Sequence, residues 1–162
     1  MNLTLTRRGD YVVRAAVCLA SVWQGEADER APTGYRKIRD VAREVSIPDS
    51  YTPQVLGLLV RAGLAESKAG PGGGYRLSRR PAAISMLDVV QAAEGTLAQG
   101  RCILRGEPCR WEESCAVHPT WFAASEAFQS VLRTTTLAQV AAEDRALAAR
   151  RPAGSDVLTG AG

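Results

Sequence analysis

Hydrophobic positions recur with helical spacing three times in the first 62 residues. In each set the apolar side chains stand three or four positions apart, as they do on one face of an α-helix. The three sets are Val13, Ala16, Val17 and Ala20, then Ile38, Val41, Ala42 and Val45, then Val55, Leu58, Leu59 and Ala62. The pattern therefore predicts three amphipathic helices near the start of the chain.

The second and third predicted helices are separated only by residues 46–50. Pro48 stops the second helix, and either Asp49 or Ser50 can cap the third. Two short helices joined this tightly form a helix-turn-helix, whose second helix enters the DNA major groove. We therefore predict a recognition helix over residues 50–62.

A glycine-rich hairpin is predicted directly after this helix. Gly63 is typical of a helix end, and predicted strands at 64–68 and 75–80 flank a turn at 69–74. No Gly-Lys-Ser/Thr follows the glycines, so a phosphate-binding loop is excluded. We interpret the hairpin as a wing that offers four cations to DNA phosphates: Lys68, Arg76, Arg79 and Arg80.

The second half of the chain is again helical at both of its ends. Ser85 and Asp88 form a capping box for a helix that ends at Gly95, and another helix begins near Pro119. A short last helix follows Thr136. The helix after Pro119 carries a bulky stripe that can pack either on its own domain or on a second subunit: Trp121, Ala124, Phe128, Val131 and Leu132.

Charge and composition narrow the function. The net charge is +3, and residues 1–80 carry 13 Lys or Arg against 8 Asp or Glu, which suits a DNA-binding first half. No apolar run is long enough for a membrane span or a signal peptide, so we expect a cytoplasmic protein. One histidine, no Cys-x-x-Cys and no phosphate loop argue against an enzyme.

Three of the four cysteines cluster in one segment of the chain. Cys102, Cys109 and Cys115 fall within fourteen residues, and the only histidine, His118, follows. Such a segment can hold an iron–sulfur cluster or a structural zinc ion, or it can act as a thiol switch without metal. The fourth cysteine, Cys18, lies beside the apolar face of the first helix and is predicted to be a core residue.

The chain resembles the family of bacterial winged-helix regulators that includes IscR, NsrR and CymR. The resemblance covers residues 3 to about 142, and its motifs are Leu5-Thr6, Ser50-Tyr51 with Gln54, Gly63-Leu64, the glycine-rich wing and the three-cysteine loop. It implies a mainly α fold with a small β-hairpin wing, that is, a winged helix-turn-helix plus a long dimerisation helix. The expected divisions are residues 1–82 for DNA binding, 83–150 for the cysteine loop and dimerisation helix, and a disordered tail at 151–162.

The same resemblance implies an iron–sulfur cluster on Cys102, Cys109 and Cys115. His118 would complete a 2Fe-2S site, which we prefer, whereas Asp10 of the partner subunit would complete a 4Fe-4S site. The protein is then a homodimeric repressor of a palindromic operator that senses iron–sulfur, redox or nitric oxide status; the alternative is a zinc-stabilised or thiol-switch regulator. The residues expected to reach bases or phosphates from the recognition helix are Ser50, Tyr51, Thr52 and Gln54.

Overall fold

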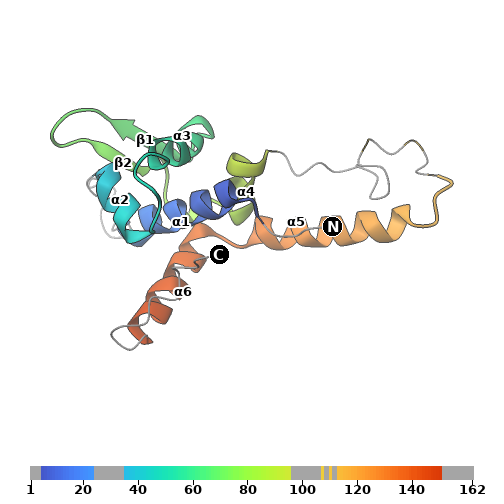
Figure 1. Cartoon of the computed structure of the whole chain (residues 1–162). Helices are drawn as coiled ribbons and strands as arrows, with labels where there is room; N and C mark the ends of the chain where they lie inside the picture. The colour runs from blue at the N-terminus through green and yellow to red at the C-terminus, as the bar shows by residue number, and fades with distance from the viewer. Residues whose placement is uncertain (1–4, 24–34, 96–106, 108–109, 111–112, 151–162) are drawn as a thin grey trace.

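The computed structural model describes residues 5–23, 35–95, 107, 110 and 113–150, and its elements follow the predicted order (Figure 1). The predicted tail at 151–162 lies outside the described residues. The elements are α1 (Arg7–Ser21), α2 (Ile38–Glu44), α3 (Thr52–Arg61), β1 (Ala65–Lys68), β2 (Gly74–Leu77), the 3-10 helix η1 (Pro81–Ala83), α4 (Met86–Glu94), α5 (His118–Thr134) and α6 (Leu137–Arg150). The predicted fold class, mainly α with a β-hairpin wing, is confirmed.

Helix α1 lies at the centre of a compact body, which we call the head and which comprises α1 to α4, the hairpin and α6. It contacts α3, α4 and α6, so it is covered from more than one side. Its buried side chains form a wide face: Val12, Ala15, Ala16, Cys18, Leu19 and Ala20. Of the predicted α1 stripe, Ala16 and Ala20 are buried, whereas Val13 and Val17 are half-buried and pack against the core.

Helix α3 begins without the cap that the sequence suggested. Neither Asp49 nor Ser50 caps it; Tyr51 holds the N-cap position and makes no side-chain cap bond. The turn is instead closed by the hydroxyl of Thr52, which donates to the carbonyl of Pro48 at 3.0 Å. The helix is anchored in the core by the fully buried side chains of Val55, Leu56 and Leu59.

The hairpin is short and is attached to the chain that precedes α2. Its antiparallel register sets Lys68 opposite Gly74, and β2 ends at Leu77, not at residue 80 as predicted. The backbone of Arg36 pairs with that of Tyr75 through two hydrogen bonds of 2.9 and 2.8 Å. A Cβ at Gly74, where φ is +147°, would lie 2.1 Å from the Arg36 carbonyl oxygen, so the close approach requires glycine.

The ends of α1 and α4 are tied together. The predicted capping box at α4 is present, with Ser85 and Asp88 each bonded to the other's backbone N–H. At the opposite end of α4, the Glu94 carboxylate accepts hydrogen bonds from the Thr6 backbone N–H at 3.1 Å and from its hydroxyl at 2.6 Å. Because Thr6 is itself the N-cap of α1, a shift of α4 is transmitted directly to α1.

Helix α5 projects from the head, and we call α5 with residues 113–117 the arm (Figure 1). Gln129 is the one buried residue of α5. Phe122, Phe128 and Val131 are 45%, 40% and 63% exposed, whereas Leu132 packs against the core of the head. Most of the predicted apolar stripe is therefore uncovered in a single chain.

Helix α6 returns to the head after the arm. Leu137 and Ala141 are buried, and the helix contacts α1 and η1. It runs for 14 residues, so the prediction of a short last helix was wrong. Thr136 and Gln139 cap its start, since each side chain bonds the other's backbone N–H.

Candidate DNA-binding surface and cysteine segment

Only some of the four residues expected to reach DNA from the start of α3 are exposed. Ser50 and Gln54 are exposed, and Tyr51 is half-buried, with its ring edge-on to Tyr11 at 5.8 Å between centroids. Thr52 is fully buried, and its hydroxyl is engaged with Pro48. The expectation that Thr52 reaches DNA is therefore corrected: its side chain supports the turn from inside the core.

Two of the wing cations surround the ring of Tyr35. The Lys68 ammonium lies 5.8 Å and the Arg76 guanidinium 4.6 Å from the ring centroid. The Tyr35 hydroxyl donates to Glu66 at 3.1 Å, and Glu66 also pairs with Arg76. These four residues form the Tyr35 cluster. Hydrogen bonds from Arg76 and then Tyr35 hold the pKa of Glu66 below its ordinary value of 4.5.

The other two wing cations, Arg79 and Arg80, are used differently. Arg79 donates to the carbonyls of Ala83 at 3.1 Å and Gly63 at 3.3 Å, and lies 3.7 Å from the Asp88 carboxylate. It therefore braces the end of α3 against the start of α4. The Arg80 side chain is exposed and makes no hydrogen bond or ion pair within the described part of the chain, so its charge is open to a phosphate.

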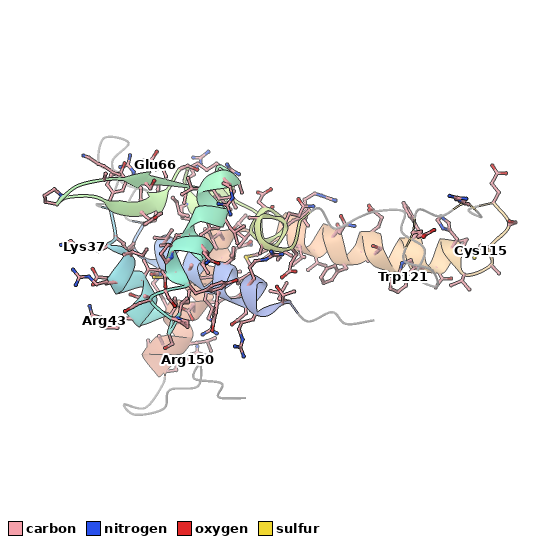
Figure 2. All side chains as sticks on the ribbon, turned by 45° about the horizontal axis from the view of Figure 1, so that its top comes forward. Lys37, Arg43, Glu66, Cys115, Trp121 and Arg150 are labelled. Atoms are coloured by element: carbon pink, nitrogen blue, oxygen red, sulfur yellow. The ribbon has the colours of Figure 1, made fainter. Side chains whose placement is uncertain are left out.

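Sequence reasoning missed a second basic surface, which lies at the start of α2 (Figure 2 labels two of its residues, Lys37 and Arg43). It surrounds a hollow of about 590 Å³ lined by Tyr35, Arg36, Lys37, Arg39, Asp40 and Arg43. Arg43 pairs with Asp40 at 3.0 Å, whereas Lys37 and Arg39 are exposed. The signal was present in the sequence, because four cations stand within residues 36–43.

The cysteine segment leads into the arm. Cys102 and Cys109 lie outside the described residues, whereas Cys115 is half-buried at the tip of the arm (Figure 2). His118 is the first residue of α5; its backbone N–H donates to the Cys115 carbonyl at 3.1 Å, and its ring stacks on Phe122 at 6.0 Å. This turn keeps a thiol and an imidazole three positions apart at one end of the helix. Both are donor types that iron and zinc accept.

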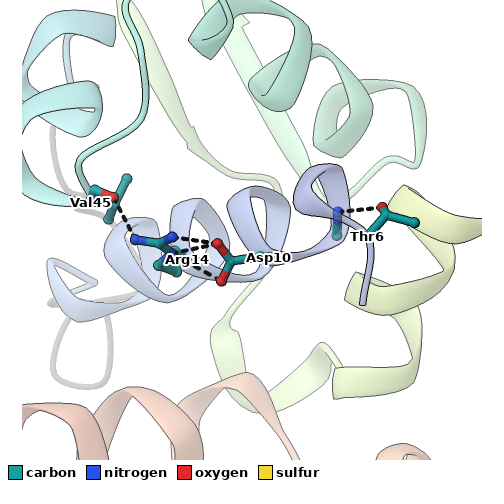
Figure 3. Close-up of polar contacts among 5 residues, drawn as sticks. Thr6, Asp10, Arg14 and Val45 are labelled. Atoms are coloured by element: carbon teal, nitrogen blue, oxygen red, sulfur yellow. Dashed lines mark hydrogen bonds and ion pairs between the residues drawn. The ribbon is translucent and has the colours of Figure 1, made fainter. Parts of the chain in front are cut away.

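No group of three or more metal-binding side chains occurs among the residues that the structure describes. Asp10, the alternative fourth ligand, lies on α1 in the head. Its carboxylate accepts from the Arg14 Nε at 3.1 Å, and Arg14 also donates to the Val45 carbonyl at 3.1 Å (Figure 3). Asp10 would have to leave this ion pair to reach a metal.

Cys18 occupies the core, as predicted. It is 3% exposed, and its Sγ accepts a hydrogen bond from Arg36 at 3.1 Å. Burial, with a smaller contribution from Glu44, raises the pKa of the Cys18 thiol to about 12. The thiol is therefore neutral and a poor metal ligand.

The sequence profile of Rrf2, described as an iron-dependent transcriptional regulator, matches residues 5–143. The chain belongs to the Rrf2 family. The HTH-type transcriptional regulator IscR of Klebsiella pneumoniae (strain 342) is 29% identical over 138 residues, which are 85% of this chain and 79% of that protein.

Two solved structures have the same fold as this Rrf2 chain, each with 26% sequence identity and a TM-score of 0.67. The match to CymR, the global cysteine regulator of B. subtilis, spans 88% of this chain and 98% of the CymR chain. For T. potens IscR, the corresponding shares are 95% and 96%. The resemblance read from the sequence is thus confirmed.

Rrf2 membership makes the chain a transcriptional regulator and not an enzyme, as expected. In the described part of this Rrf2 chain, no helix has both the length and the apolar character that a membrane span requires.

Proposed function

We propose that this Rrf2 chain is a homodimeric repressor whose affinity for a palindromic operator in double-stranded DNA is set by an iron–sulfur cluster on its cysteine segment. One observation carries the proposal: a single chain joins an exposed α3 and basic hairpin to a cysteine-bearing arm with an uncovered apolar face. The similarity to IscR along most of the chain supports it.

In the proposed complex, two α3 helices enter successive major grooves. Ser50, Tyr51 and Gln54 reach base edges or nearby phosphates, because they stand at the start of α3. Lys68 of the hairpin and Arg80, which follows it, bind flanking phosphates, since both are exposed. Arg76 and Arg79 act mainly by holding the hairpin in position, because each is engaged within the head. Binding to the chromosome sets the site of action in the bacterial cytoplasm.

Dimerisation is assigned to the arm. Phe122, Phe128 and Val131 are exposed on α5, and a helix with such a face lowers its free energy by covering it. Pairing with α5 of a second chain covers it symmetrically, as closed dimers require. The arm then fixes the distance between the two heads.

The proposed cluster ligands are Cys102, Cys109, Cys115 and His118, which suit a 2Fe-2S cluster. We favour His118 over the partner subunit's Asp10, since Asp10 is paired with Arg14. An iron–sulfur cluster supplies a centre that changes charge and ligation when it meets an oxidant or nitric oxide.

Coupling between the cysteine segment and the head follows from the chain path. Residues 96–117 join the end of α4 to the start of α5, and α5 itself contacts α4, so a change in the position of α5 acts on α4. There, Glu94 holds Thr6 at the start of α1, and α1 packs on α3. The orientation of the reading helix is thus linked to the cysteine segment.

The test is anaerobic purification followed by iron, acid-labile sulfide and zinc analysis. We expect a brown protein with iron and sulfide, and loss of both in Cys102→Ala, Cys109→Ala or Cys115→Ala with the dimer retained. Cys18→Ala is the matched control and keeps the cluster, because Cys18 lies in the core. A colourless protein with one bound zinc would contradict the proposal and favour the zinc-stabilised alternative.

The fourth ligand is tested by a pair of variants. His118→Ala should change the visible spectrum and reduction potential, and Asp10→Ala should leave both unchanged. The reverse pattern would assign the position to Asp10 across the dimer. Unchanged spectra in both variants would exclude both residues.

A further inference from the structure

A pocket separate from the DNA-binding surface and the cysteine segment lies between α1, the end of α2 and α6. Its volume is about 320 Å³, which is within the range of small-molecule sites. The apolar part of its wall includes Ala148 and four valines: Val13, Val17, Val45 and Val140. Val13 and Val17 are half-buried residues of α1.

The charged side chain of this pocket that has no partner among the described residues is a carboxylate. Arg14, Glu44 and Asp144 are its charged lining residues. Arg14 is engaged with Asp10 and with the Val45 carbonyl. The Asp144 side chain, in contrast, makes no hydrogen bond or ion pair with any residue that the structure describes. Both Glu44 and Asp144 also raise the pKa of the Cys18 thiol, which lines the same pocket, as expected for a negative potential inside it.

We propose that this pocket binds a small organic cation with an apolar body. The cationic group lies between the carboxylates of Asp144 and Glu44, and the apolar body lies against the valine wall. An anion is disfavoured because it would face two carboxylates. A neutral apolar molecule offers no charge to the Asp144 carboxylate, which has no partner among the described residues.

Arg36 links this pocket to the wing. Its guanidinium donates to the Cys18 Sγ at 3.1 Å and pairs with Glu44 at 2.6 Å, both of which line the pocket. Its backbone pairs with Tyr75 of β2. A bound cation competes with Arg36 for Glu44, so occupancy of the pocket changes how the base of the wing is held. Any effect on operator affinity rests on the proposed function, whereas binding of the cation and the shift at Tyr75 do not.

The test uses NMR of the full-length chain titrated with cyclohexylammonium chloride at constant ionic strength. We expect saturable shifts of the Val17 and Val140 methyl signals and of the Tyr75 amide signal, and none with cyclohexanol or ammonium chloride. Asp144→Asn should weaken binding about fivefold, as for an exposed ion pair. The matched control is Glu143→Gln, an exposed neighbour outside the pocket, which should bind as the unmodified chain does.

Three results would overturn the proposal. Absent methyl shifts would show that the pocket does not bind the cation, and equal shifts with cyclohexanol would show that charge plays no part. Saturable methyl shifts with an unmoved Tyr75 amide would overturn the link through Arg36. None of these readouts uses DNA, so they are independent of whether the chain represses an operator.

Discussion

The head and the arm are built in opposite ways. The head encloses a core that includes fully buried Leu56, Leu59 and Leu137, and its segments are joined by polar contacts such as that of Glu94 with Thr6. The arm has one buried residue, Gln129, and leaves Phe122 and Val131 largely exposed. A part that a single chain completes thus adjoins a helix whose apolar face a single chain leaves uncovered. The head therefore packs its own core, whereas the arm is completed by a second copy only in the proposed dimer.

The largest expected effect lies in the core of the head. Leu56→Ala should lower the free energy of unfolding by about 3 kcal/mol, because it leaves a cavity at a fully buried position. Leu147→Ala, at a position 55% exposed, should change it by less than about 0.5 kcal/mol. Urea denaturation at one fixed protein concentration measures both. An equal loss of unfolding free energy in the two variants would contradict the assignment of Leu56 to the core and Leu147 to the surface.

On the arm, Val131→Asp should separate the dimer without unfolding the head. An unpaired carboxylate in the interface should raise the dimer dissociation constant by about 100-fold or more. Sedimentation velocity measures the dissociation constant, and circular dichroism checks that the helices remain. Leu147→Asp makes the same change on an exposed residue of α6 and should leave the dimer intact. If Val131→Asp stays dimeric, the interface lies elsewhere.

Within the head, Gln54 and Arg80 should separate base reading from phosphate binding. Gln54→Ala should weaken binding to the cognate operator about tenfold and binding to random DNA little. Arg80→Ala should weaken binding to both DNAs equally, and it should reduce the slope of log affinity against log salt concentration by about 1. Fluorescence anisotropy at several salt concentrations measures this. Arg80 is a cleaner test than Arg79, which also braces α3. Two variants that behave alike on both DNAs would refute the separate roles.

The smallest effect concerns the pH dependence of the hairpin. Because the folded pKa of Glu66 lies below its ordinary value of 4.5, its stabilising contribution is complete above that pH and is lost as the pH falls through the lowered pKa. NMR signals of the Tyr35 ring should therefore titrate with a midpoint below 4.5. Glu66→Gln should abolish the titration. A midpoint at or above the ordinary value would contradict the Tyr35 cluster.

Features that depend on residues close in sequence were predictable. The Ser85–Asp88 capping box and the turn between α2 and α3 were found because each is specified within a few residues. The proximity of Cys115 and His118 was likewise visible in their spacing.

Features that depend on tertiary contacts were not predictable. Thr52 was assigned to DNA because the helix-turn-helix pattern favours polar residues there, but packing places it in the core. The Tyr35 cluster joins residues 31 positions apart, which no local pattern specifies. The buried face of α1 is wider than its predicted stripe and also includes Val12, Ala15 and Leu19, because several helices cover α1.

If the cysteine segment controls the orientation of α3, a change in that segment changes the affinity of the dimer for its operator. The dissociation constant for the operator should be measured anaerobically for the unmodified dimer as purified and for Cys109→Ala, with Cys18→Ala as the control. We expect at least about a tenfold difference in this dissociation constant between the unmodified protein and Cys109→Ala, the size of a typical allosteric coupling. Cys18→Ala should match the unmodified protein. Equal operator affinity for Cys109→Ala and the unmodified protein would contradict the claim.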